Sequence, residues 1–390
     1  MSRERLFSPL KIGNVHVSHR MVMAPMTRYR ADDDGVPMDD IVKEYYSQRA
    51  STPGTLLITE ATVISPRAGG TSNVPGIWND TQISAWKKVT DAVHEKKCFI
   101  FCQLWALGRR ADPEILQNAE GGPYPLVGPS SKPVVEGSQS VPHALTREEI
   151  RVFVDDYATA ARKAMAAGFD GVEVHGANGY LPDQFLQEAI NDRTDEYGGS
   201  TTNRARFALE LTKAIISAVG GDGRKVAFRL SPWSEFDADG HDIKKTTNPE
   251  PQFSYLISEL KRLGLAYLHL VESRYSGDAA TAEYHVLTRR NDPFIELWGP
   301  EAPIILAGGF TPETARKATE GIYQNSNVFI AFGRLYISTP DLPYRIQAGI
   351  PPNPYNRETF YLKMSSVGYT DYPFIPQPLD PRIRSVMRTR

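Results

Sequence analysis

The chain contains little cysteine, with Cys98 and Cys102 as the only two thiols in 390 residues. Both belong to the run CFIFCQLW, which is typical of a strand, and residues four apart on a strand are separated by about 13 Å, beyond disulfide reach. Two thiols also fall short of the four ligands of a structural zinc site. We therefore expect neither a disulfide framework nor a metal site, and we interpret both cysteines as small buried hydrophobic residues.

The sequence also lacks an excess of charge and a long apolar run. Its 44 Lys and Arg residues nearly balance 46 Asp and Glu residues, so no basic stripe points to nucleic acid. The longest apolar stretch, residues 99–108, is too short to cross a bilayer, and the first ten residues hold no apolar core of a secretory signal. These features predict a cytoplasmic protein that acts on a small molecule as a monomer or homodimer, with no nucleic-acid or membrane partner.

Two glycine-rich nucleotide signatures are missing as well, namely G-x-G-x-x-G after a strand and G-x-x-x-x-G-K-[ST]. Short β-branched runs alternate instead with amphipathic helical runs, a pattern typical of a parallel sheet or barrel. Eight such runs occur, at residues 21–26, 55–61, 98–105, 171–175, 225–231, 265–272, 303–309 and 328–333. The length alone would allow two or three domains, but eight β/α units predict a single α/β domain over residues 1–390, a (β/α)8 TIM barrel.

Three stretches exceed ordinary loop length, at about residues 108–143, 232–251 and 273–300. Each follows a strand, so we expect all three to rise over the C-terminal face, where barrel active sites lie. The N-terminal run IGNVHVSHR predicts a short hairpin that caps the other end. Thr339-Pro340 predicts a helix N-cap followed by proline at the first helical position.

Polar side chains stand at the carboxyl ends of the predicted strands. Strand alternation places Arg229 with Ala227 and Ser231 on one face of the fifth strand, inside the barrel. A buried guanidinium is costly unless an anion meets it, so Arg229 indicates an anionic ligand.

Strands seven and eight end in glycine. Gly308 and Gly309 follow the seventh strand, and Gly333 is followed at once by Arg334. Loops after these two strands form the usual phosphate site of barrel enzymes, because bare backbone N–H groups can approach the oxygens and an arginine adds a bidentate donor. The glycines could instead be ordinary turn residues, but the added arginine favours a phosphate-bearing ligand.

The fourth strand runs into His175-Gly-Ala-Asn178-Gly-Tyr180. A single histidine at a strand end could be a structural residue, but small residues here let the chain curl over the barrel mouth. His175 and Asn178 can together donate two hydrogen bonds to one carbonyl oxygen, as an oxyanion hole does. Tyr180 can then act as the proton donor.

These residues belong to motifs through which the chain resembles the old yellow enzyme family of flavin-dependent ene-reductases, from about Leu6 to about Pro373. The motifs include MAPMTR at 23–28, YYSQRA at 45–50, QLW at 103–105, DGVEVHGANGYL at 170–181, FRLSP at 228–232, FGR at 332–334 and GYTDYP at 368–373. The resemblance is to the fungal branch, in which some members serve natural-product pathways.

The resemblance implies a barrel that holds FMN, is reduced by NADPH, and then reduces a C=C bond activated by a carbonyl or nitro group. It assigns flavin contacts to a set of residues around the barrel mouth: Pro25, Thr27, Ala61, Gln103, Arg229, Gly308, Gly309, Gly333 and Arg334. It assigns the substrate oxygen to His175 and Asn178 and protonation of the α-carbon to Tyr180. The implied walls of the substrate pocket are Trp105, Phe236 and Tyr369.

Two other hypotheses remain open. A flavin-free barrel lyase or aldolase could use His175 as its base, although no Schiff-base lysine stands at a strand end. The second hypothesis is a non-catalytic, flavin-binding relative of these enzymes. The presence of His175, Asn178 and Tyr180 argues against it.

Overall fold

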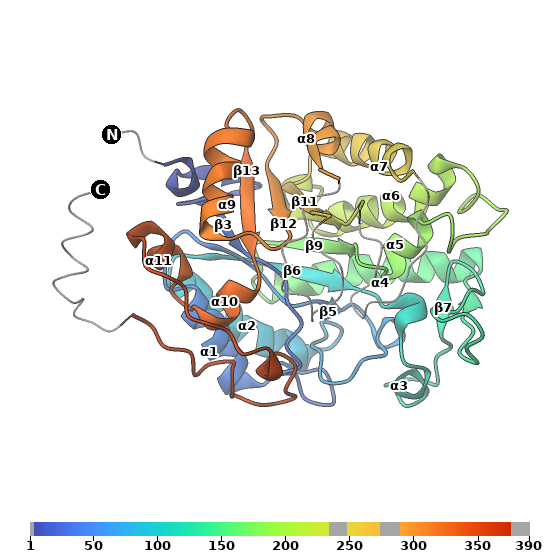
Figure 1. Cartoon of the computed structure of the whole chain (residues 1–390). Coiled ribbons are helices and arrows are strands. Elements are labelled where there is room, and N and C mark those ends of the chain that lie inside the picture. The colour runs from blue at the N-terminus through green and yellow to red at the C-terminus, as the bar shows by residue number, and fades with distance from the viewer. Residues whose placement is uncertain (1–3, 234–247, 274–288, 376–390) are drawn as a thin grey trace.

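The computed structural model describes residues 4–233, 248–273 and 289–375. Its centre is a closed ring of eight parallel strands, each paired with the next along the chain and the last paired with the first (Figure 1). The strands of the ring are β3 (Met21–Met23), β4 (Leu56–Ile58), β6 (Phe99–Trp105), β9 (Gly171–Gly176), β10 (Val226–Leu230), β11 (Tyr267–Val271), β12 (Ile304–Ala307) and β13 (Val328–Phe332). The predicted (β/α)8 barrel is confirmed, and each strand lies within its predicted run except β9, which extends one residue further, to Gly176.

Helices outside the ring connect one strand to the next, and the last of them, α11, follows the final strand β13 (Figure 1). They are α1 (Asp39–Arg49), α2 (Asp80–Glu95), α4 (Arg147–Ala166), α6 (Thr201–Ala218), α7 (Glu250–Arg262), α8 (Asp292–Trp298), α9 (Pro312–Lys317) and α11 (Leu342–Ala348). Shorter elements are α3 (Pro113–Gln117), α5 (Leu181–Leu186), α10 (Arg334–Ser338), β5 (Thr62–Val63), β7 (Val127–Gly128) and β8 (His143–Ala144).

A hairpin closes the N-terminal end of the barrel, as predicted. Strands β1 (Leu10–Ile12) and β2 (Val15–Val17) pair antiparallel, and their apolar side chains pack with the lowest residues inside the ring. Gly13 makes the turn at φ 56°, and a Cβ there would lie 2.3 Å from the carbonyl oxygen of Arg224, just before β10. The turn therefore needs glycine both for its backbone conformation and for the close approach.

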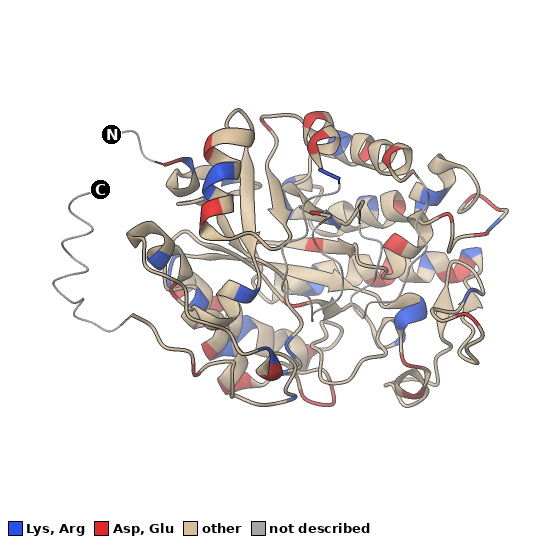
Figure 2. Ribbon diagram, in the orientation of Figure 1, with Lys and Arg blue, Asp and Glu red and all other residues tan. Residues whose placement is uncertain are grey.

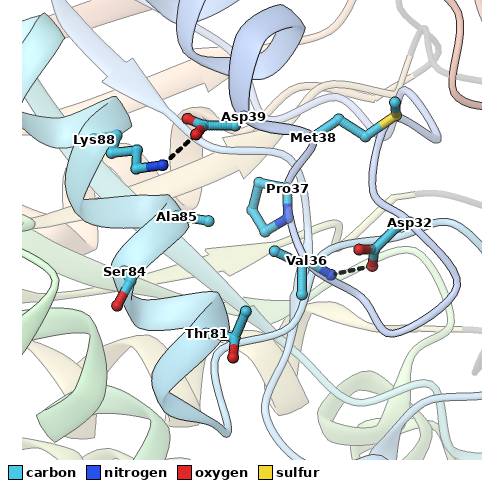
Figure 3. Close-up of a pocket in the computed structure, with 9 residues that line it drawn as sticks. All are labelled: Asp32, Val36, Pro37, Met38, Asp39, Thr81, Ser84, Ala85 and Lys88. Carbon is cyan, nitrogen blue, oxygen red and sulfur yellow. Dashed lines mark hydrogen bonds and ion pairs between the residues drawn. The ribbon is translucent and has the colours of Figure 1, made fainter.

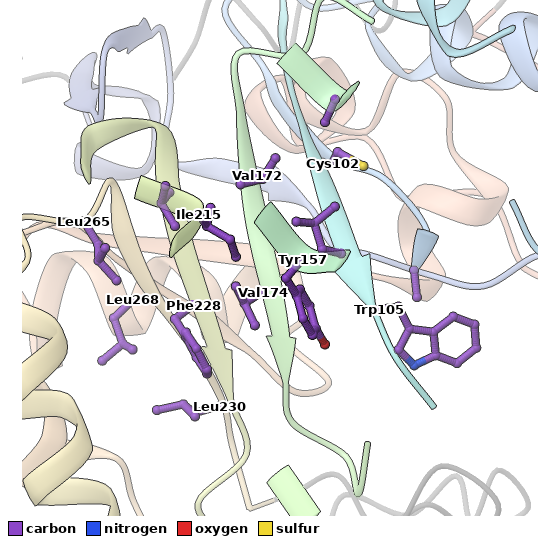
Figure 4. Close-up of a cluster of buried hydrophobic side chains, with 14 of the residues drawn as sticks. Cys102, Trp105, Tyr157, Val172, Val174, Ile215, Phe228, Leu230, Leu265 and Leu268 are labelled. Atoms are coloured by element: carbon purple, nitrogen blue, oxygen red, sulfur yellow. The ribbon is translucent and has the colours of Figure 1, made fainter. Parts of the chain in front are cut away.

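Apolar side chains fill the layer between the ring and its helices. Figure 4 shows Val172 and Val174 of β9 and Phe228 of β10 pointing outward, toward Tyr157 of α4 and Ile215 of α6. Because strand side chains alternate, the residues between these positions face into the barrel. Both cysteines are buried and unpaired, as predicted, and burial raises the pKa of Cys102 to about 12.

The long excursions differ in detail from the prediction. Residues 108–143 carry α3 and the β7–β8 pair. Residues 234–247 and 274–288 lie outside the described part of the chain. The stretch predicted over 273–300 ends earlier, because its residues 292–298 form α8, the barrel helix that follows β11.

The helix start predicted at Thr339-Pro340 is wrong. Thr339 ends α10, and α11 begins at Leu342 after the N-cap residue Asp341. The Asp341 carboxylate accepts hydrogen bonds from Arg345 Nε at 2.8 Å and from the Ile375 N–H at 2.9 Å. These buried contacts fix the helix start two residues after the expected position.

Neither charge nor apolarity sets one region of the ribbon apart. In the view of Figure 2, basic and acidic residues are interspersed over the helices and loops. Among the described residues, no helix combines the length and apolarity that a membrane span requires.

Candidate active site

The turn after β9 brings three of the predicted site residues together. Asn178 adopts φ 57°, in the left-handed region that asparagine tolerates. Its N–H donates to Ser231 Oγ at 2.9 Å, and the next N–H, of Gly179, donates to Asp183 Oδ2 at 2.8 Å. The chain is thereby folded back, so that the Tyr180 ring lies 4.8 Å from the His175 ring, centroid to centroid.

Two polar atoms of this cluster are buried without a hydrogen-bond partner among the described residues. They are His175 Nδ1 and Asn178 Oδ1. The two side chains are only 4% and 9% exposed. Buried polar atoms are nearly always satisfied in folded proteins, so two unsatisfied ones within three residues of each other, at the end of one strand, indicate a place for a ligand.

The His175 imidazole is neutral at physiological pH. Burial lowers the pKa of His175 well below its ordinary value, and the positive charges of Arg229 and Arg110 lower it further. A neutral imidazole donates through one nitrogen only. His175 can therefore contact a ligand here by hydrogen bonding, without a positive charge on its ring.

Of the predicted pocket walls, Trp105 lies at this cluster. Its ring meets the Tyr180 ring edge-on at 4.9 Å. Phe236 lies outside the described residues. The role predicted for Tyr369 is wrong, because its ring is fully buried, stacked on Tyr45 of α1 at 4.0 Å.

Three arginines hold Tyr369 in this buried position. The guanidinium groups of Arg28 and Arg30 lie 5.1 and 4.8 Å from its ring, and Arg49 Nη2 donates to its carbonyl oxygen at 3.0 Å. Arg28 and Arg30 also donate to carbonyl groups between residues 359 and 368. The GYTDYP motif is thus part of a C-terminal segment that is fastened to the barrel, and its tyrosine is an anchor.

Beneath the His175 cluster, the inside of the barrel holds a second set of polar residues. Gln103 of β6 and Glu173 of β9 are paired in register and bonded, with 2.7 Å from Gln103 Nε2 to Glu173 Oε1. Glu173 Oε2 lies 2.8 Å from His269 Nδ1 of β11. Arg229 of β10 is in register with both His175 and His269.

The sequence prediction overlooked Glu173 and His269. Both occupy alternate, inward positions in GVEVH and LAYLHLV, a signal that could have identified them. Their presence corrects the inference drawn from Arg229, because the nearby Glu173 carboxylate is the anion whose absence was assumed. The position of Arg229 by itself does not require an anionic ligand.

The predicted phosphate residues do come together. Gly308 and Gly309 follow β12 at φ 134° and 71°, conformations that suit glycine. The nearest side-chain atom to a Cβ built on Gly309 is Arg334 Nη2, at 3.8 Å. The glycines therefore leave bare backbone beside a guanidinium, as a phosphate cradle requires.

Other predicted flavin contacts lie at the same end of the barrel. Pro25 and Thr27 follow β3 and are half-buried, while Ala61 follows β4 and is buried. The carboxyl ends of parallel barrel strands meet at one face, so these residues share the mouth with His175.

A cavity elsewhere offers no competing site. About 330 Å³ lies between the N-terminal ends of α1 and α2, lined by nine residues that include Lys88 and Asp39 (Figure 3). Those two ionic side chains pair with each other, and none of the lining residues belongs to the predicted site.

Comparison with known proteins agrees with the geometry. The sequence model of the NADH:flavin oxidoreductase / NADH oxidase family matches residues 5–353. A chanoclavine-I aldehyde reductase of Penicillium roqueforti is 52% identical over 370 residues, 95% of this chain and 96% of the relative. A probable inactive reductase of Epichloe festucae var. lolii is 48% identical over 377 residues, 96% of each chain.

The fold agrees with a solved structure of the same kind. The old yellow enzyme from Pichia sp. AKU4542 superimposes with a TM-score of 0.85 at 37% identity, covering 96% of this chain and 95% of that chain. The resemblance read from the motifs is confirmed, and this chain belongs to the NADH:flavin oxidoreductase / NADH oxidase family.

Proposed function

We propose that this FMN-family oxidoreductase uses NADPH to reduce a C=C bond conjugated to a carbonyl or nitro group. The observation that supports this best is the buried cluster in which His175 Nδ1 has no hydrogen-bond partner among the described residues, with the Tyr180 ring 4.8 Å from the imidazole, centroid to centroid. Overall, the alkene gains a hydride at the β-carbon and a proton at the α-carbon, while NADPH becomes NADP⁺.

The residues present fit FMN. Gly308, Gly309, Gly333 and Arg334 would hold its phosphate, because bare backbone and a guanidinium meet there. Thr27, Gln103 and Arg229 would hold its ring, the last supplying positive charge at the pyrimidine edge. When bound and reduced, the flavin supplies the hydride.

Side chains of the protein stabilise the charge on the substrate oxygen and supply the proton for the α-carbon. His175 and Asn178 donate hydrogen bonds to the substrate oxygen, on which negative charge builds as the β-carbon is reduced. Losing one such preorganised donor typically costs about 3 kcal/mol. Tyr180 gives its hydroxyl proton to the α-carbon, and Trp105 supports its ring.

The simplest test is product analysis. Cyclohexenone and NADPH should yield cyclohexanone, and in D₂O one deuterium should appear on the α-carbon, the position that solvent-derived protons reach through Tyr180. Recovery of unreduced enone, or of a cleavage product from a lyase or aldolase reaction, would contradict the proposal.

The substrate class follows from the relatives. One is named a chanoclavine-I aldehyde reductase, so aldehydes with a conjugated C=C bond are the first class to test, and a place in fungal secondary metabolism is part of the proposal. Other relatives are named probable inactive enzymes. We infer activity here because a non-catalytic site would not need His175, Asn178 and Tyr180 together. The cytoplasmic location and the oligomeric state stay predictions.

Arg334→Ala should weaken FMN binding by about 10- to 100-fold, because a hydrogen bond to a charged group contributes about 1.5–3 kcal/mol. The measurement is FMN titration of apoprotein by flavin fluorescence. Arg316→Ala, which changes a half-buried arginine on α9 that pairs with Glu4, is the matched control and should bind FMN normally. Equal affinity in the two variants would remove Arg334 from the phosphate site.

Binding of cyclohexenone to the oxidised holoprotein should show no inflection from His175 between pH 6 and 8. The shifted pKa keeps the imidazole neutral over this range, whereas an ordinary histidine would titrate near pH 6.5. The measurement is the dissociation constant against pH in the wild type and in His175→Ala. An inflection near pH 6.5 that disappears in the variant would contradict the assignment. One that persists would belong to another group, such as Glu60, whose burial raises its pKa to about 7.

A further inference from the structure

The buried carboxylate of Glu173 has no part in the chemistry assigned above. Its side chain is fully buried inside the barrel, two residues before His175 on the same inward face of β9. It accepts from Gln103 Nε2 at 2.7 Å and lies 2.8 Å from His269 Nδ1. A buried charge is expensive to keep, so an ionised carboxylate at this point calls for a role.

Glu173 is ionised in the folded protein. Burial on its own would raise the pKa of Glu173, but His269, Arg229 and Gln103 together lower it below its ordinary value. Burial and the charge of Arg229 lower the pKa of His269, although Glu173 opposes them, so the imidazole is neutral and donates its Nδ1–H. Among these four inward-facing residues, the negative charge of the Glu173 carboxylate is therefore opposed by the positive charge of the Arg229 guanidinium.

An ionised carboxylate also fixes the amide of Gln103. A carboxylate can only accept hydrogen bonds, so the NH₂ end of the amide must face it and the carbonyl end must point away. A flipped amide would place its oxygen against a negative charge. Below the carboxylate, Phe101 packs 5.4 Å from the Tyr267 ring, and burial together with the Glu173 charge raises the pKa of the Tyr267 phenol, so the carboxylate is well shielded from solvent.

We propose that Glu173 is a positioning residue for the flavin, which orients the Gln103 carbonyl toward the ring N3–H and partly balances the charge of Arg229. The proposal rests on the FMN site argued above. The pyrimidine edge of a flavin has one N–H donor, N3–H, which needs an acceptor such as the Gln103 carbonyl. The same edge becomes negative on two-electron reduction, so the field of Glu173 lowers the flavin potential.

The test is Glu173→Gln, which removes the charge and lets the Gln103 amide flip. FMN affinity of the apoprotein should fall about tenfold. The two-electron potential should rise by ~30 mV, which corresponds to a tenfold change in the equilibrium constant. Asp170→Asn is the matched control, since it also replaces a carboxylate by the matching amide. Asp170 lies at the other end of β9, where it accepts from the Ile100 N–H at 2.8 Å. This control should alter neither quantity.

A double-mutant cycle separates positioning from general destabilisation. In a Gln103→Leu background, Glu173→Gln should change FMN affinity less than about twofold, because the residue through which Glu173 acts is gone. The potential should still rise, since the charge on Arg229 is unbalanced in both backgrounds. A tenfold affinity loss in both backgrounds, or an unchanged potential, would overturn the proposal.

If Glu173→Gln does not fold, ¹⁵N-labelled FMN decides the question. The N3 resonance should be shifted downfield in the wild type by the Gln103 carbonyl and should lose part of that shift in Glu173→Asp, whose shorter side chain withdraws the carboxylate from the Gln103 amide. Equal shifts would overturn the proposal. These readouts report FMN binding alone, so normal flavin results with no enone reduction would contradict the proposed function and leave the role of Glu173 standing.

Discussion

Tyr180→Phe should slow reoxidation of the reduced protein by cyclohexenone by about 10²–10⁴-fold, the usual contribution of a positioned general acid. Tyrosine has an ordinary pKa of about 10 and is protonated at neutral pH, so it can give its proton to a developing carbanion. The ring packs edge-on against Trp105 and against His175, and phenylalanine keeps those contacts. The fold, the flavin content and reduction by NADPH should therefore survive.

Stopped-flow measurement of the two half-reactions tests this prediction. In Tyr180→Phe, the rate of reoxidation by a nitroalkene should fall less than the rate of reoxidation by cyclohexenone. The reduced nitroalkene is stable enough as an anion to take its proton from water. The rate of reoxidation by oxygen should fall least, because this reaction protonates no carbon atom. Tyr255→Phe on the outer helix α7 is the matched control and should behave as the wild type.

If enone reoxidation in Tyr180→Phe stays within about threefold of the wild type, another acid performs the protonation. The role of Tyr180 would then be withdrawn. The hydride donor and the oxygen site would be unaffected, because they involve different atoms.

The second large effect is expected at the oxygen site. His175→Ala or Asn178→Ala should weaken binding of enones and phenols and slow their reduction by about 10²-fold, since each removes one donor from the oxygen. Flavin reduction by NADPH should change far less, because in this hypothesis both side chains act on the substrate oxygen and only marginally on the hydride donor. The double variant should lose less than the product of the two single losses if both hold one oxygen.

Titration with a phenol and stopped-flow reduction by NADPH give the two numbers for each variant. His94→Ala on α2 is the matched control, a half-exposed histidine paired with Asp170. Equal losses in the two half-reactions would show that His175 and Asn178 do not act on the substrate oxygen.

The alternation of strand side chains correctly predicted which residues face into the barrel. Val226, Phe228 and Leu230 of β10 pack outward, so Arg229 had to face the interior, as it does. The positions of His175 and Arg334 followed equally from the ends of their strands, because parallel strands in a barrel finish at one face.

Side-chain partners between distant strands could not be read in the same way. Glu173 meets Gln103 and His269 only because the ring closes with a particular stagger, which the register of the strands sets. Tyr369 was misplaced for a similar reason. Its buried position depends on contacts with arginines more than 300 residues earlier in the chain. A local sequence pattern cannot predict such contacts.

The visible spectrum of the purified protein under anaerobic conditions tests the central claim most directly. The account predicts a yellow protein whose flavin absorbance is bleached by NADPH and restored by cyclohexenone, and which releases FMN and no FAD on denaturation. A colourless protein, a bound FAD, or a bleached flavin that cyclohexenone fails to reoxidise would contradict it.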